Sequence, residues 1–228
     1  SFSGNKPTNF FERSNAMAKR NTDNPRKLSQ EESKRQKQFV EYSDLLQSQG
    51  YRQKLLTIPI KEANKQALIL GLPIVVILGA VFFLLHQFAP FGTSPLEILL
   101  LLVLFLVLVV VHELIHGITW SCFAEKRFKA ISFGIMNETY NPYCTCNEAL
   151  TRTQYIIGAL APTVILGILP CVIAIAIGSA PFFLLGALMI LAGGGDLAIC
   201  KKLLFHKQTG ETIYLDHPTE CGLVAFSK

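Results

Sequence analysis

Two long stretches of the chain carry almost no charge, and this constrains the fold more than any other feature. Between Lys65 and Glu97 the only Asp, Glu, Lys, Arg or His is His86, and residues 153–195 contain none of these five types. Only 16% of the 228 residues are charged, whereas roughly a quarter is usual for a soluble domain. Charge that is segregated in this way is typical of a polytopic membrane protein and argues against an ordinary soluble fold.

The first uncharged stretch holds one apolar segment, a second apolar segment follows it, and the long uncharged stretch after Arg152 divides into two. Each of the four is long enough to cross a hydrocarbon core of about 30 Å as a helix. Turn residues separate the first segment from the second at Ala89-Pro90-Phe91-Gly92, and the third from the fourth at Gly178-Ser179-Ala180-Pro181. We therefore predict an all-α polytopic membrane protein whose transmembrane domain covers residues 67–200. The four predicted helices lie at about residues 67–88, 95–120, 154–177 and 180–200.

The basic residues predict the orientation. Thirteen of the 21 Lys and Arg precede the first helix, four lie between the second and third helices, and four follow the last one. The two remaining loops have none, so both termini and the middle loop are expected on the cytoplasmic side. We expect an integral protein of a bacterial cytoplasmic membrane, in contact with the lipid bilayer. This bias accounts for the net charge of +5, and no nucleic-acid partner is expected.

The segments outside the membrane are short. Residues 1–28 are polar and aperiodic, which predicts a disordered tail, and Ser14-Asn15-Ala16 resembles a remnant of an expression vector. Residues 29–66 are predicted to form a cytoplasmic amphipathic helix, opened by a capping box at Ser29–Glu32, and then a short strand at 54–60. Residues 201–228 are expected to be a cytoplasmic tail. The helix, with Phe39, Tyr42, Leu45 and Leu46 on one side, either packs lightly on the domain or places Lys34, Arg35 and Lys37 against anionic lipid.

The middle loop is too short for a domain, but its pattern predicts a cytoplasmic β-hairpin. Ile131–Ile135 alternates as a strand does, residues 136–139 can turn the chain, and residues 140–146 can return. Pro142 restricts the second strand to a sheet edge. Such an edge either holds an unwound substrate segment by strand addition or is a simple connector.

The segment VVVHELIHGITW, residues 109–120, places two histidines and a glutamate at the end of an apolar run. His112 and His116 are four residues apart, so a helix projects both imidazoles from one face, with Glu113 beside the first. In the zincin arrangement His-Glu-x-x-His, the imidazoles bind Zn²⁺ and the glutamate acts on a water molecule. In a chain of this composition, about 0.006 such matches arise by chance. The alternative is a polar cluster solvated at a helix end.

A catalytic zinc site usually has three protein ligands and one position open to water. Outside the His-Glu-x-x-His segment, Asp196 is the only acid embedded in a predicted helix, and its expected depth matches that of His116. Gly193-Gly194-Gly195 precede it, so neighbouring helices can approach closely there or the fourth helix can loosen locally. We therefore predict a metal site formed by His112, His116 and Asp196. The rival third ligands are Asp216, His217 and Cys144.

These residues carry a resemblance to a known family. His112–His116, Gly158–Pro162 and Gly195-Asp196 resemble the zincin peptidase family of small polytopic membrane proteins, which is similar to the site-2 intramembrane metalloproteases. The resemblance extends from about Gly50 to the C-terminus and implies Zn²⁺ held by His112, His116 and Asp196, with Glu113 catalytic. Site-2 proteases usually carry an Asp-Gly pair, whereas here Leu197 follows Asp196. This departure leaves the oxyanion-stabilising residue unassigned.

Together these features predict a zinc-dependent intramembrane or membrane-embedded metalloprotease that hydrolyses peptide bonds near the cytoplasmic face. Glu113 is predicted to take a proton from water and pass it to the leaving amine. The expected partner is a membrane-protein or peptide substrate, and the sequence leaves the oligomeric state open. The alternatives are a membrane metal transporter or sensor, and a non-catalytic membrane scaffold that is stabilised by zinc.

Overall fold

The structure is a computed structural model that describes residues 30–87, 94–135, 141–208 and 210–228. The predicted tail at residues 1–28, the capping residue Ser29 and the predicted hairpin turn lie outside these ranges.

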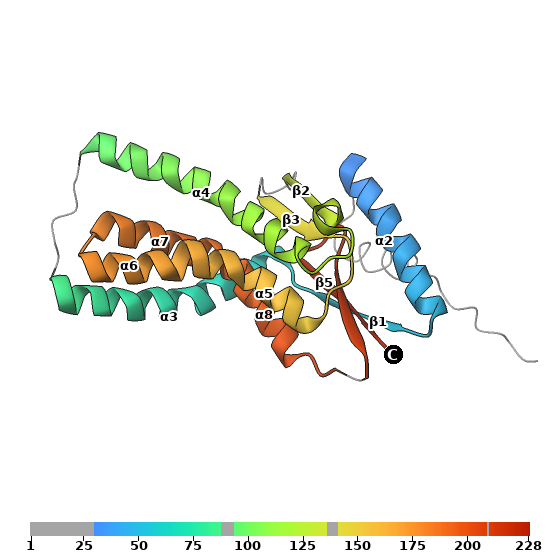
Figure 1. Cartoon of the computed structure of the whole chain (residues 1–228). Coiled ribbons are helices and arrows are strands. Elements are labelled where there is room, and N and C mark those ends of the chain that lie inside the picture. Colours follow the sequence, from blue (N-terminus) through green and yellow to red (C-terminus); the bar gives the residue numbers. More distant parts are fainter. Residues whose placement is uncertain (1–29, 88–93, 136–140, 209) are drawn as a thin grey trace, which may run out of the picture.

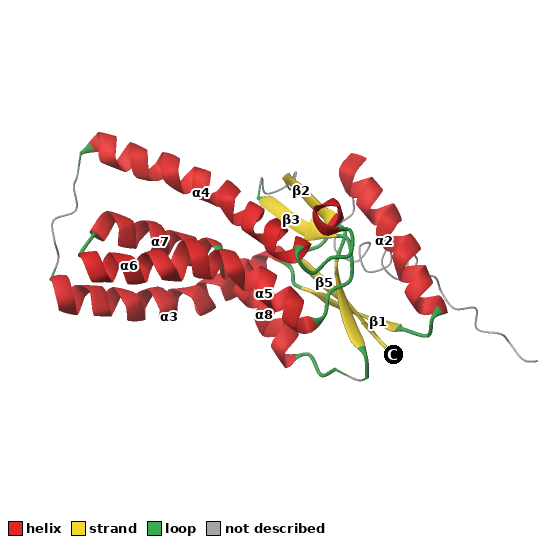
Figure 2. Cartoon of the chain, in the orientation of Figure 1, coloured by secondary structure: helices red, strands yellow, loops and turns green. Residues whose placement is uncertain are grey.

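Long helices pack side by side at one end of the molecule, and two small sheets with one further helix occupy the other end (Figures 1 and 2). The α-helices are α2 (Gln30–Ser48), α3 (Ile60–His86), α4 (Pro95–Ser121), α5 (Arg152–Pro162), α6 (Leu169–Ile177), α7 (Ala180–Ala192) and α8 (Gly194–Phe205). A 3-10 turn, η1 (Arg127–Ala130), follows α4, and a π-helical segment, η2 (Thr163–Ile168), joins α5 to α6. The strands are β1 (Arg52–Thr57), β2 (Ile131–Ile135), β3 (Pro142–Cys146), β4 (Thr212–Asp216) and β5 (Gly222–Ser227).

Three helices of the described chain are long and apolar enough to cross a membrane, namely Lys61–His86, Pro95–Ser121 and Arg152–Ile177. A fourth crossing is possible if Ala180–Ala192 and Gly194–Phe205, which are bent by 47° at Gly193, form one broken span. The predicted number of four helices agrees with this count when the bent pair is taken as one. The break falls within the three consecutive glycines, where the sequence predicted local loosening.

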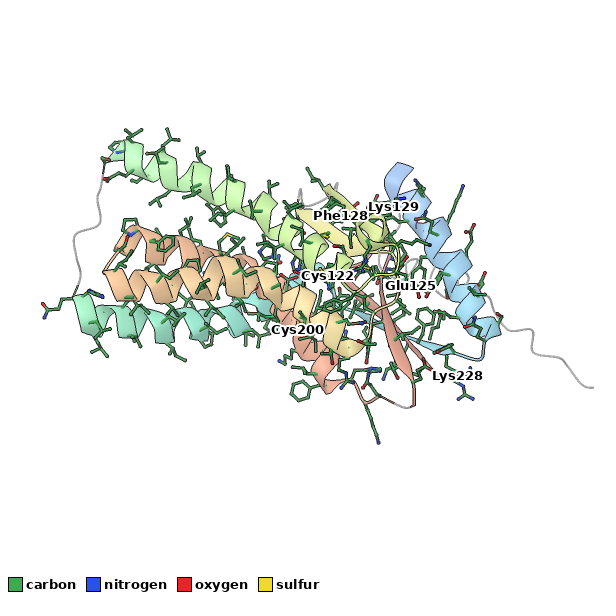
Figure 3. All side chains as sticks on the ribbon, viewed as in Figure 1. Cys122, Glu125, Phe128, Lys129, Cys200 and Lys228 are labelled. Atoms are coloured by element: carbon green, nitrogen blue, oxygen red, sulfur yellow. The ribbon has the colours of Figure 1, made fainter. Side chains whose placement is uncertain are left out.

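The outer surfaces of these helices are apolar. Large hydrophobic side chains such as Leu84, Leu96 and Val110 are more than 60% exposed, which in a soluble protein would be a severe aggregation hazard. Helix α4 lies against the other helices near its C-terminal end and diverges from them toward its N-terminal end (Figure 1). In contrast, the labelled polar residues Glu125, Lys129 and Lys228 lie at the end that carries the sheets (Figure 3).

The chain is mostly helical, but it also contains two antiparallel sheets, so the all-α description is incomplete. The predicted hairpin is present as β2 paired with β3, in the register Ile131↔Cys146 and Ile135↔Pro142. The second sheet has the order β1-β5-β4, so strands from both ends of the described chain pair directly. A strand near β1 was predicted, whereas residues 201–228 were expected to be a tail, although Pro218, between the segments that form β4 and β5, and Gly222, at the start of β5, are turn residues.

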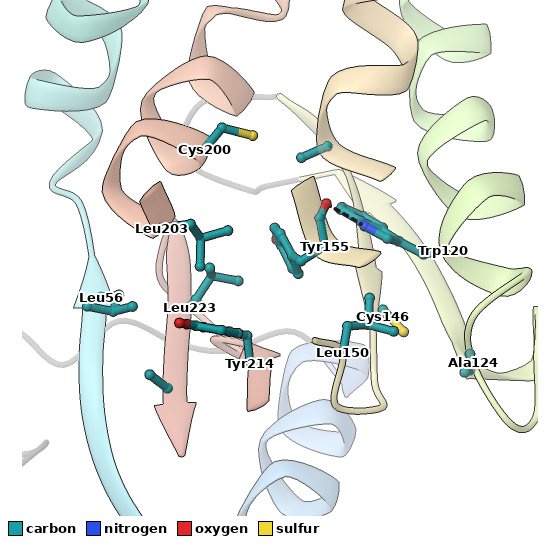
Figure 4. Close-up of a cluster of buried hydrophobic side chains, with 13 residues drawn as sticks. Leu56, Trp120, Ala124, Cys146, Leu150, Tyr155, Cys200, Leu203, Tyr214 and Leu223 are labelled. Atoms are coloured by element: carbon teal, nitrogen blue, oxygen red, sulfur yellow. Dashed lines mark hydrogen bonds between the residues drawn. The ribbon is translucent and has the colours of Figure 1, made fainter. Parts of the chain in front are cut away.

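A buried cluster joins this sheet to the helices. The side chains of Tyr155 from α5, Leu203 from α8, Tyr214 from β4 and Leu223 from β5 meet there and are almost completely buried (Figure 4). The backbone of Leu150 also forms a two-way bridge to Tyr214, with N–H···O distances of 2.8 Å. The sheet is therefore packed firmly against the ends of α5 and α8.

Helix α2 packs on the C-terminal sheet and the hairpin. Phe39 and Leu46 are buried against β4 and β5, whereas Leu45, which was expected on the same face, is 51% exposed. The Arg35 guanidinium lies over the Tyr143 ring of β3 at 4.4 Å and donates to Thr145 Oγ1. These contacts favour the packing alternative for α2 over the lipid-facing one, at least for Arg35.

The close contact between α3 and α8 gives a test of the fold. A Cβ added at Gly194 would lie 2.5 Å from Ala67 Cβ and 2.6 Å from Ala67 Cα, whereas a Cβ at Gly195 would meet nothing within 4 Å. We expect Gly194→Ala to destabilise the purified protein by about 1–3 kcal/mol, as overpacking of a core does. Gly195→Ala is the matched control and should leave the thermal unfolding midpoint unchanged or slightly higher. Equal midpoints for the two variants would contradict the packing of α3 on α8.

Candidate metal centre

Helix α4 supplies the two histidines. His112 and His116 lie one turn apart near the C-terminal end of the helix, and their side chains are only 6% and 3% exposed. The buried residues of α4 are His112, His116, Gly117 and Trp120, whereas the other side chains of this helix are partly or fully exposed. Helical periodicity therefore places both rings toward the interior, as the sequence predicted.

Helix α8 supplies the acid. The chain bends at Gly193, and Asp196 then lies in the first turn of α8 with its carboxylate directed at the two imidazoles. Asp196 Oδ2 lies 3.1 Å from His112 Nε2 and 3.4 Å from His116 Nε2, and the two Nε2 atoms are 3.2 Å apart. His112, His116 and Asp196 are the one group in the described chain whose ligand atoms are close enough to share a metal ion.

These distances fit a tetrahedral metal site. In such a site, with bonds of about 2.0–2.1 Å to nitrogen or oxygen, neighbouring ligand atoms lie about 3.3 Å apart. The observed triangle of 3.1, 3.2 and 3.4 Å is close to one face of that tetrahedron. Without a cation, nitrogen lone pairs and a carboxylate would face one another in an apolar interior, which is unfavourable. The donor set of two imidazoles and one carboxylate is also one that Zn²⁺ accepts.

The orientation of His116 is fixed by neighbours on α4 and α5. His116 Nδ1 lies 2.9 Å from the carbonyl oxygen of Gly158, which places its proton on Nδ1 and leaves Nε2 free to bind a metal. The Trp120 indole stacks on the imidazole, with ring centroids 5.0 Å apart and planes inclined by 15°. Trp120 Nε1 donates to the carbonyl of Tyr155 at 3.2 Å (Figure 4).

Gly158 is needed for this arrangement. A Cβ at this position would lie 2.1 Å from Trp120 Cδ1, so a larger residue would displace the indole that stacks on His116. Gly158 belongs to the segment Gly158–Pro162, which resembles the zincin peptidase family, but no structural role was predicted for it. Trp120 and Tyr155 were not identified as supporting residues, because aromatic residues at helical spacing are equally typical of an ordinary core.

The side chains of His112, His116 and Asp196 line a cavity of about 610 Å³. Its wall is formed by α3, α4, α7 and α8 on the helical side, and by β3, Arg35 of α2 and the segment 216–222 on the sheet side. Glu113 lines this cavity beside the histidines, and its carboxylate has the backbone N–H of Cys144 as a hydrogen-bond partner. The predicted catalytic glutamate therefore faces the same space as the predicted ligands.

The three rival ligands lie on the cavity wall but do not join the cluster. Asp216 accepts hydrogen bonds from the Tyr155 hydroxyl at 2.6 Å and from the Cys146 N–H at 2.7 Å. His217 Nδ1 accepts the backbone N–H of Glu220 at 2.9 Å. Burial, reinforced by the charge of Glu113, raises the pKa of the Cys144 thiol far above its usual range, which keeps it protonated and a poor ligand.

Asp216 connects three parts of the cavity wall. It belongs to β4, while its two hydrogen-bond donors come from α5 and β3. Burial raises the pKa of Asp216 to about 6, and the hydrogen bonds from Tyr155 and Cys146 oppose that shift without cancelling it. That Asp216 joins β4 to α5 and β3 was not predicted, since these three segments are far apart in the sequence and meet only in the folded protein.

Comparison with known proteins supports a zincin-like protein. Residues 105–209 match the model of a family described as "Putative zincin peptidase". The matched part contains His112, Glu113, His116 and Asp196, and it is narrower than the resemblance expected from about Gly50 onward. No curated protein and no solved structure matches the chain.

The raised pKa of Asp216 gives a pH-dependent prediction. An unfolded Asp releases its proton near pH 3.8, whereas folded Asp216 holds it to about pH 6. The folded state therefore binds more protons in this window, and its stability falls as the pH rises from about 4 to 6, by about 3 kcal/mol at most. Asp216→Asn removes the titrating group and retains an oxygen that can accept the Cys146 N–H.

We expect the thermal midpoint of the wild type to decrease relative to that of Asp216→Asn between pH 4 and pH 7. The comparison uses both proteins in the same detergent, so that groups common to them cancel. Parallel curves for the two proteins would show that Asp216 does not bury its charge on folding.

Proposed function

We propose that the protein is a membrane-embedded zinc metalloendopeptidase that hydrolyses peptide bonds near one face of the bilayer. The observation that carries this proposal is the triangle of His112 Nε2, His116 Nε2 and Asp196 Oδ2, with Glu113 on the same cavity wall. Three ligands leave one position of a tetrahedral ion for water or substrate, as catalytic rather than structural zinc sites do. The family match over residues 105–209 supports the same class of enzyme.

In the proposed reaction, His112, His116 and Asp196 would hold Zn²⁺, which would serve as the Lewis acid for the scissile carbonyl and for the attacking water. Glu113 is the general base. Its carboxylate takes a proton from the attacking water and then passes that proton to the leaving amine. The Cys144 N–H holds this carboxylate toward the cavity, and the Gly158 carbonyl keeps the proton of His116 on Nδ1.

We infer that the substrate is a membrane protein or an apolar peptide and that cleavage takes place close to the cytoplasmic face of a bacterial membrane. The histidines lie near the C-terminal end of α4, which is long and apolar enough to cross a bilayer, and Asp196 lies in the first turn of α8, the second half of the bent pair. Exposed cations such as Lys126, Lys129 and Lys201 gather toward that end. The positive-inside rule then supports an orientation with both termini in the cytoplasm.

The hairpin is the proposed binding edge for an unwound substrate. The Asn147 N–H donates to the Ala130 carbonyl, and hydrogen-bonded pairs alternate along an antiparallel ladder. Thr145 and Tyr143 therefore bond to β2. The N–H and C=O groups of Cys144 and Cys146 point away from β2. The Cys146 N–H is already held by Asp216 and the Cys144 N–H by Glu113, so a substrate strand would bond to the outward carbonyl of Cys144, beside Glu113. A substrate strand added at this edge would therefore present its backbone directly to the catalytic glutamate.

The first functional test compares Glu113→Gln with the wild type. The variant should retain zinc, because Glu113 is not a ligand, and should lose about 10²–10⁴-fold in cleavage rate, the usual contribution of a general base. Zinc is measured by elemental analysis of protein purified without chelators, and cleavage by profiling new protein termini in membranes that contain either protein. Glu125→Gln, at an exposed position just after α4 (Figure 3), is the matched control.

A zinc-stabilised scaffold would give identical terminus profiles for the wild type and Glu113→Gln. A protein that contains no zinc, or a His112→Ala variant that contains as much as the wild type, would remove the basis of the proposal.

The second functional test concerns the backbone of β3. Cys144→Pro removes the N–H that holds the Glu113 carboxylate without breaking a bond to β2, because Cys144 lies at a non-hydrogen-bonded pair with Phe133. We expect cleavage to fall at least about tenfold, the cost of losing one hydrogen bond to a charged group, while zinc content stays unchanged. Cys144→Ala, which keeps the N–H, should cleave normally. Normal cleavage by Cys144→Pro would show that β3 does not position the catalytic glutamate.

A further inference from the structure

Two buried polar atoms near the metal cluster have no hydrogen-bond partner. Among the described residues, His112 Nδ1 and Thr163 Oγ1 belong to a group of only four such side-chain atoms, the others being on Arg35 and Arg152. The Thr163 side chain is 1% exposed. Native proteins leave few buried polar groups unpaired, so two of them beside one functional site call for a physical explanation.

The two atoms lie in the same small region of the bundle. The point where a Cβ at Gly193 would stand is 2.1 Å from Thr163 Oγ1 and 3.4 Å from His112 Cε1, the ring carbon bonded to Nδ1. Thr163 begins the π-helical segment η2, and Gly193 lies at the bend between α7 and α8. Two irregular points of the backbone therefore meet at the outer side of the His112 ring.

The two groups are chemically complementary. A neutral imidazole that binds a metal through Nε2 carries its proton on Nδ1, and that proton needs an acceptor. His116 has such an acceptor in the Gly158 carbonyl, whereas His112 Nδ1 has no hydrogen-bond partner among the described residues. The Thr163 hydroxyl oxygen is an acceptor of the required kind and is not bonded to a carbonyl of its own helix, as threonines in helices often are.

We propose that Thr163 is the positioning residue of His112. Its hydroxyl oxygen accepts the Nδ1–H of His112 through one bridging water molecule and so holds the imidazole in the tautomer and orientation that present Nε2 to the metal. The proposal rests on the metal site proposed above. The role of Thr163 also explains the glycine at position 193, because a side chain there would occupy the space of the Thr163 hydroxyl.

The test is a zinc-affinity comparison on the purified full chain, using a chromophoric chelator as competitor. Thr163→Val keeps the shape of the side chain and removes the hydroxyl, whereas Thr163→Ser keeps the hydroxyl and removes a methyl group. We expect Thr163→Val to weaken zinc binding about tenfold or more, as loss of an outer partner of a ligand does, and Thr163→Ser to bind within about threefold of the wild type. Equal affinity of Thr163→Val and the wild type, or an equal loss in Thr163→Val and Thr163→Ser, would overturn the assignment.

A second variant keeps the inference testable if Thr163→Val does not fold. Gly193→Ala leaves Thr163 in place but forces its hydroxyl away, so it should weaken zinc binding as Val does, while Gly195→Ala should not. Unchanged affinity in Gly193→Ala would count against the role of Thr163. A wild type that binds no zinc would overturn both the metal site and the role of Thr163. A wild type that binds zinc, together with a Thr163→Val variant of equal affinity, would overturn only the role of Thr163.

Discussion

The meeting of two imidazoles and a carboxylate inside an apolar bundle is the constraint on which the rest of the structure depends. His112, His116 and Asp196 present lone pairs to one another at 3.1–3.4 Å, in surroundings that offer little solvation. Such an arrangement needs a compensating positive charge, which a divalent cation or a protonated imidazole would supply. The helix bend at Gly193 places Asp196 opposite the histidines.

A chain of side-chain contacts links the histidines to the two sheets. Trp120 stacks on His116 and donates to the Tyr155 carbonyl, while the Tyr155 hydroxyl donates to Asp216 on β4. Asp216 in turn holds the backbone of Cys146 on the hairpin. The histidines, the hairpin edge and the C-terminal sheet are therefore connected through one short chain of contacts.

The sequence predicted what depends on local pattern, and missed what depends on tertiary assembly. Helical spacing and depth were sufficient to choose His112, His116 and Asp196, which the structure brings together, and alternation with Pro142 was sufficient for the hairpin. The sheet of β1, β5 and β4 was missed because strand order joins segments more than 150 residues apart. The outward turn of Leu45 was missed because periodicity places a residue on a face without saying where that face ends.

The position of β5 has a consequence for access to the histidines. This strand pairs with β1 on one side and β4 on the other, and residues 216–222, which connect β4 to β5, line part of the cavity. The sheet side of the cavity wall therefore forms only when β5 has paired with both of its neighbours. Local unpairing of β5 would open the cavity from that side.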